Sequence, residues 1–186
     1  YENRERAPYV IFNEKVFCGL GRGVSETGLM IEEAMELATK TLKRFSMLLN
    51  KMDITNPRVI ATSAVRDADN GQDFIKRVKD HTGLSINIIK GVEEARLSGY
   101  GVICAVPHAS GIVGDLGGGS LELAIVDDKM VSNEVTLPIG PLRLQDQDGK
   151  WFNNPKSVVK KHLKSIDWLK NARGQKFYAV GGAWRS

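Results

Sequence analysis

Apolar residues follow two different spacings along the chain, and each spacing predicts a different kind of element. From about residue 29 to residue 50 they recur at gaps of three and four, which is the spacing of one helix face. Similar spacing predicts further helices at about 72–81, 93–106 and 155–171. Short apolar runs predict strands at 9–12, 16–18, 58–65, 85–90, 111–116, 120–126, 130–137 and 177–180.

Glycine, proline and short polar residues mark the ends of several of these elements. Gly83 follows the helix at 72–81, where a glycine commonly ends a helix in the left-handed conformation. Asn154 and Pro155 form a favourable N-cap and first-turn pair for the helix at 155–171. Residues 142–154 are polar, and we expect them to form a loop.

Helices and strands alternate up to about residue 106, and three strands then follow one another. This change of order predicts an α/β fold with a subdomain boundary near residues 107–110. The chain opens without methionine, and it closes on Gly181-Gly182, where a strand–turn–helix unit would be expected to continue. We therefore expect it to be a piece of a longer protein.

Composition narrows the class of protein. With 42% hydrophobic and 26% charged residues over 186 positions, the chain is typical of globular proteins, which excludes long disorder. No apolar run is long enough to span a membrane, and two cysteines are too few for a disulfide scaffold or a thiolate zinc site. We expect a cytoplasmic protein. The net charge of +4 suits an anionic partner but is also common in proteins without one.

The segment from Val113 to Leu123 carries the strongest chemical signal. An apolar strand leads to Asp115, three glycines and Ser120 follow, and Glu122 lies on the next strand. Glycine backbone can approach a phosphate closely, and the two carboxylates could hold a divalent cation directly or through water. A Gly-rich hairpin without such a role is the alternative. The segment is neither a P-loop nor a dinucleotide-binding fingerprint, because no Gly-Lys-Ser/Thr follows and a strand comes next.

Three other segments accompany this one along the chain. In order, the four are Ala-Thr-Ser-Ala-Val-Arg-Asp-Ala at 61–68, Gly-Val-Glu-Glu-Ala-Arg-Leu at 91–97, 114–123, and Val-Gly-Gly-Ala-Trp-Arg at 180–185. By their order and spacing the chain resembles the exopolyphosphatase/guanosine pentaphosphate phosphohydrolase (Ppx/GppA) family of the actin-like ATPase superfamily, and the resemblance covers most of the chain.

The resemblance implies a role for each matching residue. Arg66 matches the family's phosphate-contacting arginine, and Glu94 matches its catalytic glutamate. The second phosphate loop matches Asp115 and the residues Gly117, Gly118, Gly119 and Ser120, and the following acid matches Glu122. The resemblance also implies dependence on Mg²⁺ or another divalent cation, held near Asp115 and Glu122.

The chain departs from the family pattern at three places. Leu121 and Ala183 stand where the family usually has threonine, and the first of these changes removes a hydroxyl from the phosphate loop. The family's first phosphate loop, an Asp-x-Gly-Ser-Asn-Ser type turn, would be expected before Tyr1. Without it the chain itself could be inactive.

The chemistry of phosphoanhydride hydrolysis agrees with these residue types. Such a reaction needs positioning and charge neutralisation, which glycine N–H groups, Arg66 and a divalent cation could supply. Glu94 would orient, and could deprotonate, the attacking water. Glu93 and Glu94 point about 100° apart on a helix, so only one of them faces a given site. Taken alone, Glu94 could instead be an acid at a helix N-terminus, and Arg66 a surface turn residue.

The resemblance implies an α/β fold of two actin-like (ribonuclease H-like) lobes, with mixed sheets flanked by helices and a cleft between them. We place the lobes at residues 1–108 and 109–186. We expect a hydrolase that releases terminal phosphate from inorganic polyphosphate, guanosine pentaphosphate or both.

Two other functions stay open. The first is a non-catalytic sensor of polyphosphate or an alarmone on the same cleft. The second is an actin-like sugar or acetate kinase, against which Arg66 and the Glu93-Glu94 pair argue. We expect no membrane partner. We also expect no nucleic-acid partner, because the tryptophans are too scattered for base stacking. The resemblance implies a homodimeric parent protein. The lysine face of the helix at 155–171 is either a solvated surface or a patch that guides polyphosphate.

Overall fold

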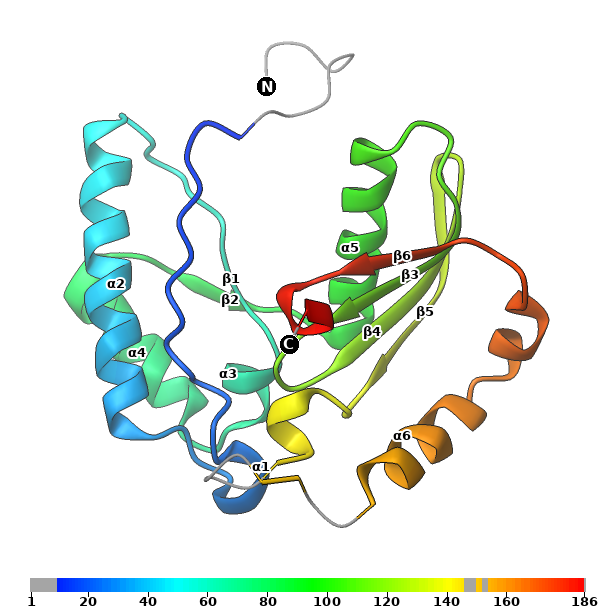
Figure 1. Ribbon diagram of the computed structural model, residues 1–186. Helices are drawn as coiled ribbons and strands as arrows, with labels where there is room; N and C mark the ends of the chain where they lie inside the picture. Colours follow the sequence, from blue (N-terminus) through cyan, green and yellow to red (C-terminus); the bar gives the residue numbers. More distant parts are fainter. Residues whose placement is uncertain (1–9, 146–149, 152–153, 186) are drawn as a thin grey trace. The chain divides into compact units, whose positions relative to one another are not determined.

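The computed structural model describes residues 10–145, 150–151 and 154–185, and it contains two sheets with helices packed on them (Figure 1). The described residues form two compact units. The first comprises residues 10–15, 91–140 and 154–185, and the second comprises residues 16–90, 141–145 and 150–151. Sheets and helices of both units confirm the predicted mixed α/β class.

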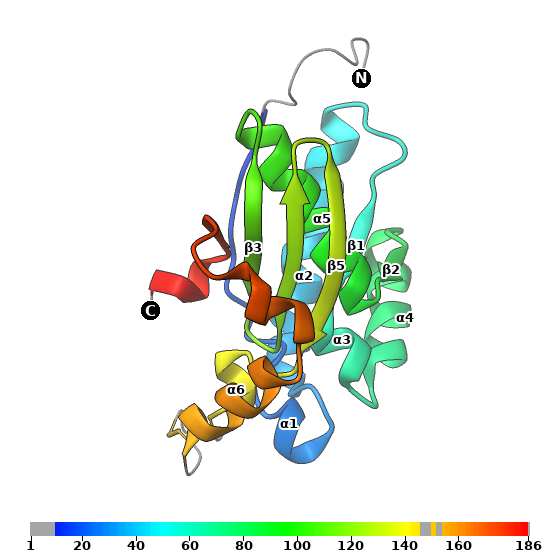
Figure 2. The same cartoon turned by 90° about the vertical axis from the view of Figure 1, so that its right-hand side faces the viewer.

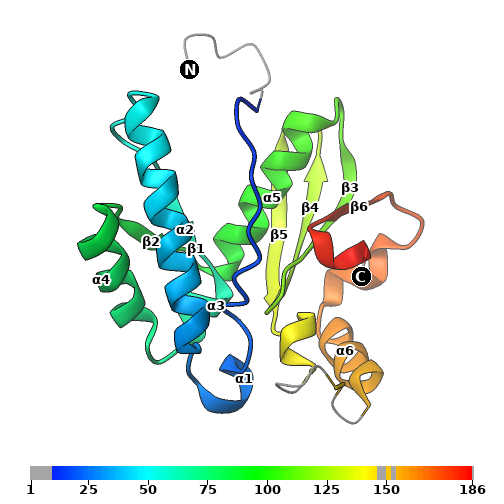
Figure 3. The ribbon, with the colours of Figure 1, turned by 60° about the vertical axis from the view of Figure 1, so that its left-hand side comes forward.

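The first unit is built on a four-stranded sheet in the order β5-β4-β3-β6. Strands β3 (Ser110–Leu116), β4 (Leu121–Asp127) and β5 (Met130–Leu137) run antiparallel, and β6 (Phe177–Val180) lies parallel to β3. Helix α5 (Gly91–Ala105) lies along β3, β4 and β5 (Figure 3). Val102 of α5 packs with Val113 and Val126 of the sheet, so α5 covers the face on which these two side chains lie.

The segment between β5 and β6 contains helix α6 (Pro155–Lys164) and the 3-10 helix η2 (Asp167–Ala172), visible in Figure 2. Asn154 caps α6 as predicted, because its side chain accepts a hydrogen bond from Ser157 N at 3.2 Å. The predicted helix at 155–171 is too long: α6 ends at Lys164, since Ser165 Oγ caps the carbonyl of His162 and the buried Ile166 is extended.

The second unit holds the parallel pair β1 (Val59–Ala61) and β2 (Ile86–Ile88). Helices α2 (Glu32–Lys51) and α4 (Gly71–Thr82) pack side by side (Figures 1 and 3). Short helices α1 (Val24–Thr27), α3 (Ser63–Asp67) and η1 (Pro141–Arg143) complete the unit. Its core contains Met30, Met35, Val65, Phe74 and Val78.

Two strand predictions are wrong in this structure, and a third is correct only in part. Residues 10–12 and 16–18 form no strand, and Tyr9 lies outside the described residues. A strand is stabilised by a hydrogen-bonded neighbour, and in the described part of the chain neither segment has one. The strand predicted at 58–65 covers only Val59–Ala61, because the chain turns into α3 from Ser63 onward, and Arg66 therefore lies on a helix instead of a turn.

The placement of the two actin-like lobes at 1–108 and 109–186 stays a prediction, as does the cleft between them. Helix α5, assigned by that prediction to the first lobe, packs on the same sheet as β3–β5. Throughout residues 10–145, 150–151 and 154–185, no helix combines the length and the apolar character needed to cross a membrane.

Candidate active site

The glycine segment forms the tight turn between β3 and β4 that the sequence predicts. Leu116 pairs with Leu121, and Gly117 N donates to Ser120 O at 3.0 Å, so residues 117–120 close a short loop. Ser120 is buried, whereas Gly118 is exposed. A Cβ at Gly140 would lie 2.5 Å from the carbonyl carbons of Gly118 and Gly119. The chain leaving β5 therefore rests directly on the backbone of the turn.

Asp115 and Glu122 lie next to this turn, opposite each other on β3 and β4. Directly opposed residues in an antiparallel pair project from the same face of the sheet, with Cβ atoms about 4.5–5.5 Å apart. Thr136 of β5 is the next partner in register, opposite Glu122. Three polar side chains thus lie in a row across three strands, on the face that α5 covers.

Hydroxyl groups hold both carboxylates in place. Ser98 Oγ of α5 donates to Asp115 Oδ2, and Thr136 Oγ1 donates to Glu122 Oε1 at 2.7 Å. Asp115 is half-buried, whereas Glu122 is only 1% exposed. Asp115 is therefore the carboxylate that a ligand can reach, and Glu122 lies behind it.

Helix α5 brings Glu94 to the same side of the sheet. Glu94 and Ser98 are four residues apart, so they lie on one stripe of the helix, and Ser98 touches Asp115. Glu93 is exposed and Glu94 half-buried, with its Oε2 shielded from solvent. The two glutamates face different surroundings, as their 100° separation predicts.

Gly91, in the first turn of α5, allows this close approach. A Cβ at Gly91 would lie 2.5 Å from the Cβ of Thr136, the residue that donates to Glu122. Larger residues would push the start of α5 off β5. The ion pair between Arg96 Nε and Glu134 Oε1, at 2.6 Å, joins the same two elements, and it lowers the pKa of the Glu134 carboxyl and raises that of Arg96.

The C-terminal Gly-Gly-Ala-Trp segment is fixed on β3. Gly181 has a φ of 93°, and a Cβ there would lie 2.9 Å from Asp115 Oδ1. Trp184 Nε1 donates to Gly114 O at 3.0 Å, and its ring packs edge-on against Phe177 with centroids 5.4 Å apart. Ser98 and the main chain of Gly181 thus flank the two oxygens of Asp115.

Arg66 belongs to the second unit. Its Nη1 donates to Ile89 O at 3.1 Å and its Nε to Asp67 Oδ1 at 3.2 Å. Asp67 also accepts a hydrogen bond from Arg143 Nη2, so two guanidinium groups share one carboxylate. An arginine held in this way is suited to bind an oxyanion.

The residues near Asp115 and Glu122 fit a magnesium ion only as a partial ligand set. No group of three or more His, Cys, Asp or Glu side chains that could hold a metal is found among the residues that the structure describes. Mg²⁺, however, is usually held by one or two carboxylates together with water and substrate phosphates. Half-buried Asp115 beside the glycine turn fits that pattern, with Glu122 as an oxygen donor behind it.

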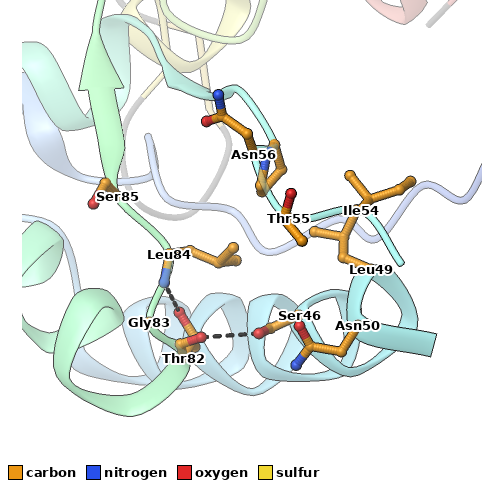
Figure 4. A pocket seen from close by; sticks show the side chains of 11 residues that line it. Ser46, Leu49, Asn50, Ile54, Thr55, Asn56, Thr82, Gly83, Leu84 and Ser85 are labelled. Atoms are coloured by element: carbon orange, nitrogen blue, oxygen red, sulfur yellow. Dashed lines mark hydrogen bonds between the residues drawn. The ribbon is translucent and has the colours of Figure 1, made fainter. Parts of the chain in front are cut away.

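A pocket of about 310 Å³ lies in the second unit, between the end of α2, residues 54–57 and the end of α4 (Figure 4). Its lining is uncharged, and Ser46 Oγ and Thr82 Oγ1 make hydrogen bonds within the protein. None of the predicted site residues lines it. The absence of charge gives it no means to neutralise a phosphate.

Sequence reasoning identified Asp115, Glu122, the glycine turn, Glu94 and Arg66, and the first unit brings all of them except Arg66 onto one sheet and its covering helix. Their chemical roles stay predictions. It missed Ser98, Thr136 and Arg143. A hydroxyl four residues after Glu94 was the available signal for Ser98, whereas Thr136 and Arg143 depend on strand register and on loop packing.

Comparison of the sequence with known proteins points to one family. Residues 1–166 match the model of the Ppx/GppA phosphatase family. The chain is 33% identical over 168 residues to the bifunctional 3-dehydroquinate synthase/phosphatase of Fusobacterium nucleatum, and 27% identical over 164 residues to exopolyphosphatase 1 of Mycobacterium leprae. These matches cover 86% and 87% of this chain but only 25% and 48% of the relatives.

Solved structures agree with this relationship. The exopolyphosphatase of Cytophaga hutchinsonii superposes with a TM-score of 0.81 at 28% identity, over 94% of this chain and 59% of that protein. A Ppx/GppA enzyme of Aquifex aeolicus gives a TM-score of 0.67 at 26% identity, over 90% and 57%. The chain therefore belongs to the Ppx/GppA phosphatase family.

Proposed function

We propose that the protein is a phosphoanhydride hydrolase that releases terminal phosphate from inorganic polyphosphate, from guanosine pentaphosphate or from both. Family membership supports this assignment, and two of the relatives carry the name exopolyphosphatase. The observation that carries the proposal is the pairing of Asp115 and Glu122 beside the glycine turn, beneath the helix that bears Glu94.

Each group has a defined part in the proposed reaction. The N–H groups of Gly118 and Gly119 and the Ser120 hydroxyl bind oxygens of the terminal phosphate, while Gly117, whose N–H donates to Ser120 O, shapes the turn. Arg66, in the second unit, stays a predicted phosphate contact on account of its guanidinium. Glu94 orients a water molecule and accepts its proton as the oxygen attacks phosphorus. The bond from that phosphorus to the bridging oxygen breaks, and a chain shortened by one phosphate leaves with the bridging oxygen.

Magnesium or another divalent cation, held by Asp115 with Glu122 behind it, would supply neutralisation of the charge on the phosphate oxygens. The hydroxyls of Ser98 and Thr136 keep the two carboxylates in one orientation before any cation binds. That arrangement avoids the loss of side-chain entropy on binding.

Phosphate release by the full-length protein, with magnesium, tests the proposal. Long polyphosphate and guanosine pentaphosphate are compared side by side, so that the ratio of rates identifies the substrate. We expect Glu94→Gln to lower kcat by roughly 10²–10⁴-fold, the usual contribution of a general base. Glu93→Gln is the matched control, because it removes the same charge from the adjacent, exposed position.

Equal rates for the two variants would contradict the role of Glu94. No release from either substrate, together with tight binding of one of them, would contradict hydrolysis and favour a sensor of that ligand.

A further inference from the structure

Positive charge is concentrated at the end of the first unit. Residues 154–185 contain eight basic side chains and a single acidic one, Asp167, which gives this segment a charge of +7. The whole chain has 26 basic and 22 acidic residues, so the rest of it has 18 basic and 21 acidic residues and a charge of −3. The modest net charge of the protein is therefore the sum of one strongly basic region and a slightly acidic remainder.

All the basic side chains of this region are exposed. We call them the basic surface: Lys156, Lys160, Lys161, Lys164, Lys170, Arg173, Lys176 and Arg185. Asp167 is the one acidic side chain that the segment offers, and it pairs with Lys170 at 3.1 Å. The segment's own carboxylate therefore neutralises only one of its eight positive charges, and most of the others face solvent or a ligand.

Helix α6 tolerates an unfavourable charge pattern. Lys156, Lys160 and Lys164 follow one another at intervals of four residues, a spacing at which like charges destabilise a helix. Lys156 also lies in the first turn, where the helix dipole disfavours a cation, and no acid of that turn offsets it. A polyanion bound along this stripe would attract each lysine and so offset these repulsions.

The residue types favour an anion with repeated charges and no bases. Six of the eight cations are lysines, which act as mobile point charges and do not grip one anion bidentately. Nucleic-acid bases would need aromatic rings to stack on. Here Phe177 and Trp184 pack against each other, Trp184 Nε1 is bonded to Gly114 O, and Trp168 is half-buried.

The basic surface leads along the chain to the candidate active site. The strand that follows it, β6, pairs with β3 so that Val180 lies opposite Asp115, and a Cβ at Gly181 would lie 2.9 Å from Asp115 Oδ1. We propose that this surface binds the body of a long inorganic polyphosphate chain whose terminal phosphate is at Asp115 and the glycine turn. This inference rests on the proposed function, and it assigns the longer, linear substrate to the site.

Binding through many phosphate contacts has two measurable consequences. Affinity should rise with chain length, because a short phosphate reaches the glycine turn without covering α6. Affinity should also fall steeply with salt, by a slope of roughly 0.7 in log K against log salt for each lysine that neutralises a phosphate. Neither effect is expected if the lysines only keep the surface hydrated.

The test measures binding of long-chain polyphosphate and of tripolyphosphate at several salt concentrations. The variant K156Q/K160Q/K161Q/K164Q removes the α6 lysines. The control K43Q/K51Q/K76Q/K79Q removes the same charge from exposed positions on α2 and α4 of the second unit. Circular dichroism checks that both variants fold, and single-stranded RNA serves as a competing polyanion.

We expect the α6 variant to bind long polyphosphate about tenfold or more weakly, with a shallower salt slope. The loss for tripolyphosphate should be much smaller, and the control should retain its affinity for long chains. Equal losses in the two variants would overturn the proposal, and so would tighter binding of RNA than of polyphosphate. If this binding pattern is found but no phosphate is released, the proposed hydrolase function is contradicted, whereas the proposal that the basic surface binds polyphosphate is supported.

Discussion

The two units of the chain differ in how their polar residues are fixed. In the first unit, Asp115, Glu122 and Thr136 are held in a row by the hydrogen-bonded register of three neighbouring strands. In the second unit the sheet has two three-residue strands, and Arg66 is held by local contacts to Asp67 and to the carbonyl of Ile89.

This difference decides which residues tolerate change. A register of many hydrogen bonds fixes side chains cooperatively, so a local substitution is transmitted along the sheet. Contacts within one helical turn and one loop can rearrange at small cost. We therefore expect substitutions beside the glycine turn to affect both stability and phosphate chemistry, and substitutions in the second unit that leave Arg66 in place to affect mainly stability.

The largest effect is expected for Gly140→Ala. The new methyl group would press on the carbonyl carbons of Gly118 and Gly119, which are backbone atoms and cannot rotate away. Overpacking of this kind costs about 1–3 kcal/mol or somewhat more. Chemical denaturation should show this loss, and a phosphate-release assay should show a lower rate in the protein that stays folded.

Two other glycines serve as comparisons. Gly71→Ala in the second unit would collide with the carbonyl of Val65, so we expect a comparable loss of stability without a specific loss of phosphate release. Gly101→Ala on α5 meets nothing within 4 Å and should raise stability by about 0.5–1 kcal/mol, as expected for glycine in a helix. A Gly140→Ala protein as stable as wild type would contradict the close packing of the turn.

The same contrast explains what the sequence could predict. The turn at 117–120 and the pairing of Asp115 with Glu122 follow from alternation and from glycine, which are local signals. The end of α4 at Gly83, with a φ of 74°, is another local signal. Thr136 was not predictable, because its contact depends on how β5 pairs with β4. The strand predicted at 58–65 was wrong after Ala61, since β-branched residues there gave no warning of α3.

A smaller effect is expected for Thr136→Val, which keeps the shape of the side chain and removes the donor to Glu122. Loss of a hydrogen bond to a buried carboxylate costs about 1–3 kcal/mol. Thr136→Ser restores the hydroxyl and should recover most of the stability and the magnesium dependence of phosphate release. In the second unit, Ser46→Ala removes a bond to the half-buried carbonyl of Thr82, and we expect it to cost less, about 1 kcal/mol.

Failure of the serine variant to recover function would show that Thr136 acts through packing against Gly91. An effect of Ser46→Ala as large as that of Thr136→Val would remove the distinction between the two units.

The smallest effect on stability is expected from removing one ion pair in each unit, Arg96–Glu134 in the first and Arg77–Glu32 in the second. Arg96 lowers the pKa of Glu134 below its ordinary value of 4.5, and Arg77 does the same for Glu32. Because the folded-state pKa is depressed, each pair stabilises the protein above about pH 4.5 and loses this contribution as the pH falls through the depressed value. Melting temperatures of Glu134→Gln and Glu32→Gln should therefore lie below that of wild type at neutral pH and converge with it in acid.

The two pairs should differ in size because they differ in solvent exposure. The Glu134 side chain is 14% exposed and that of Glu32 56%, so water and salt screen the second pair more strongly. We expect the larger shift in melting temperature for Glu134→Gln, and salt should reduce the shift of Glu32→Gln more. A larger effect at Glu32 would show that the docking of α4 on α2 depends on charge more than the docking of α5 on β5 does.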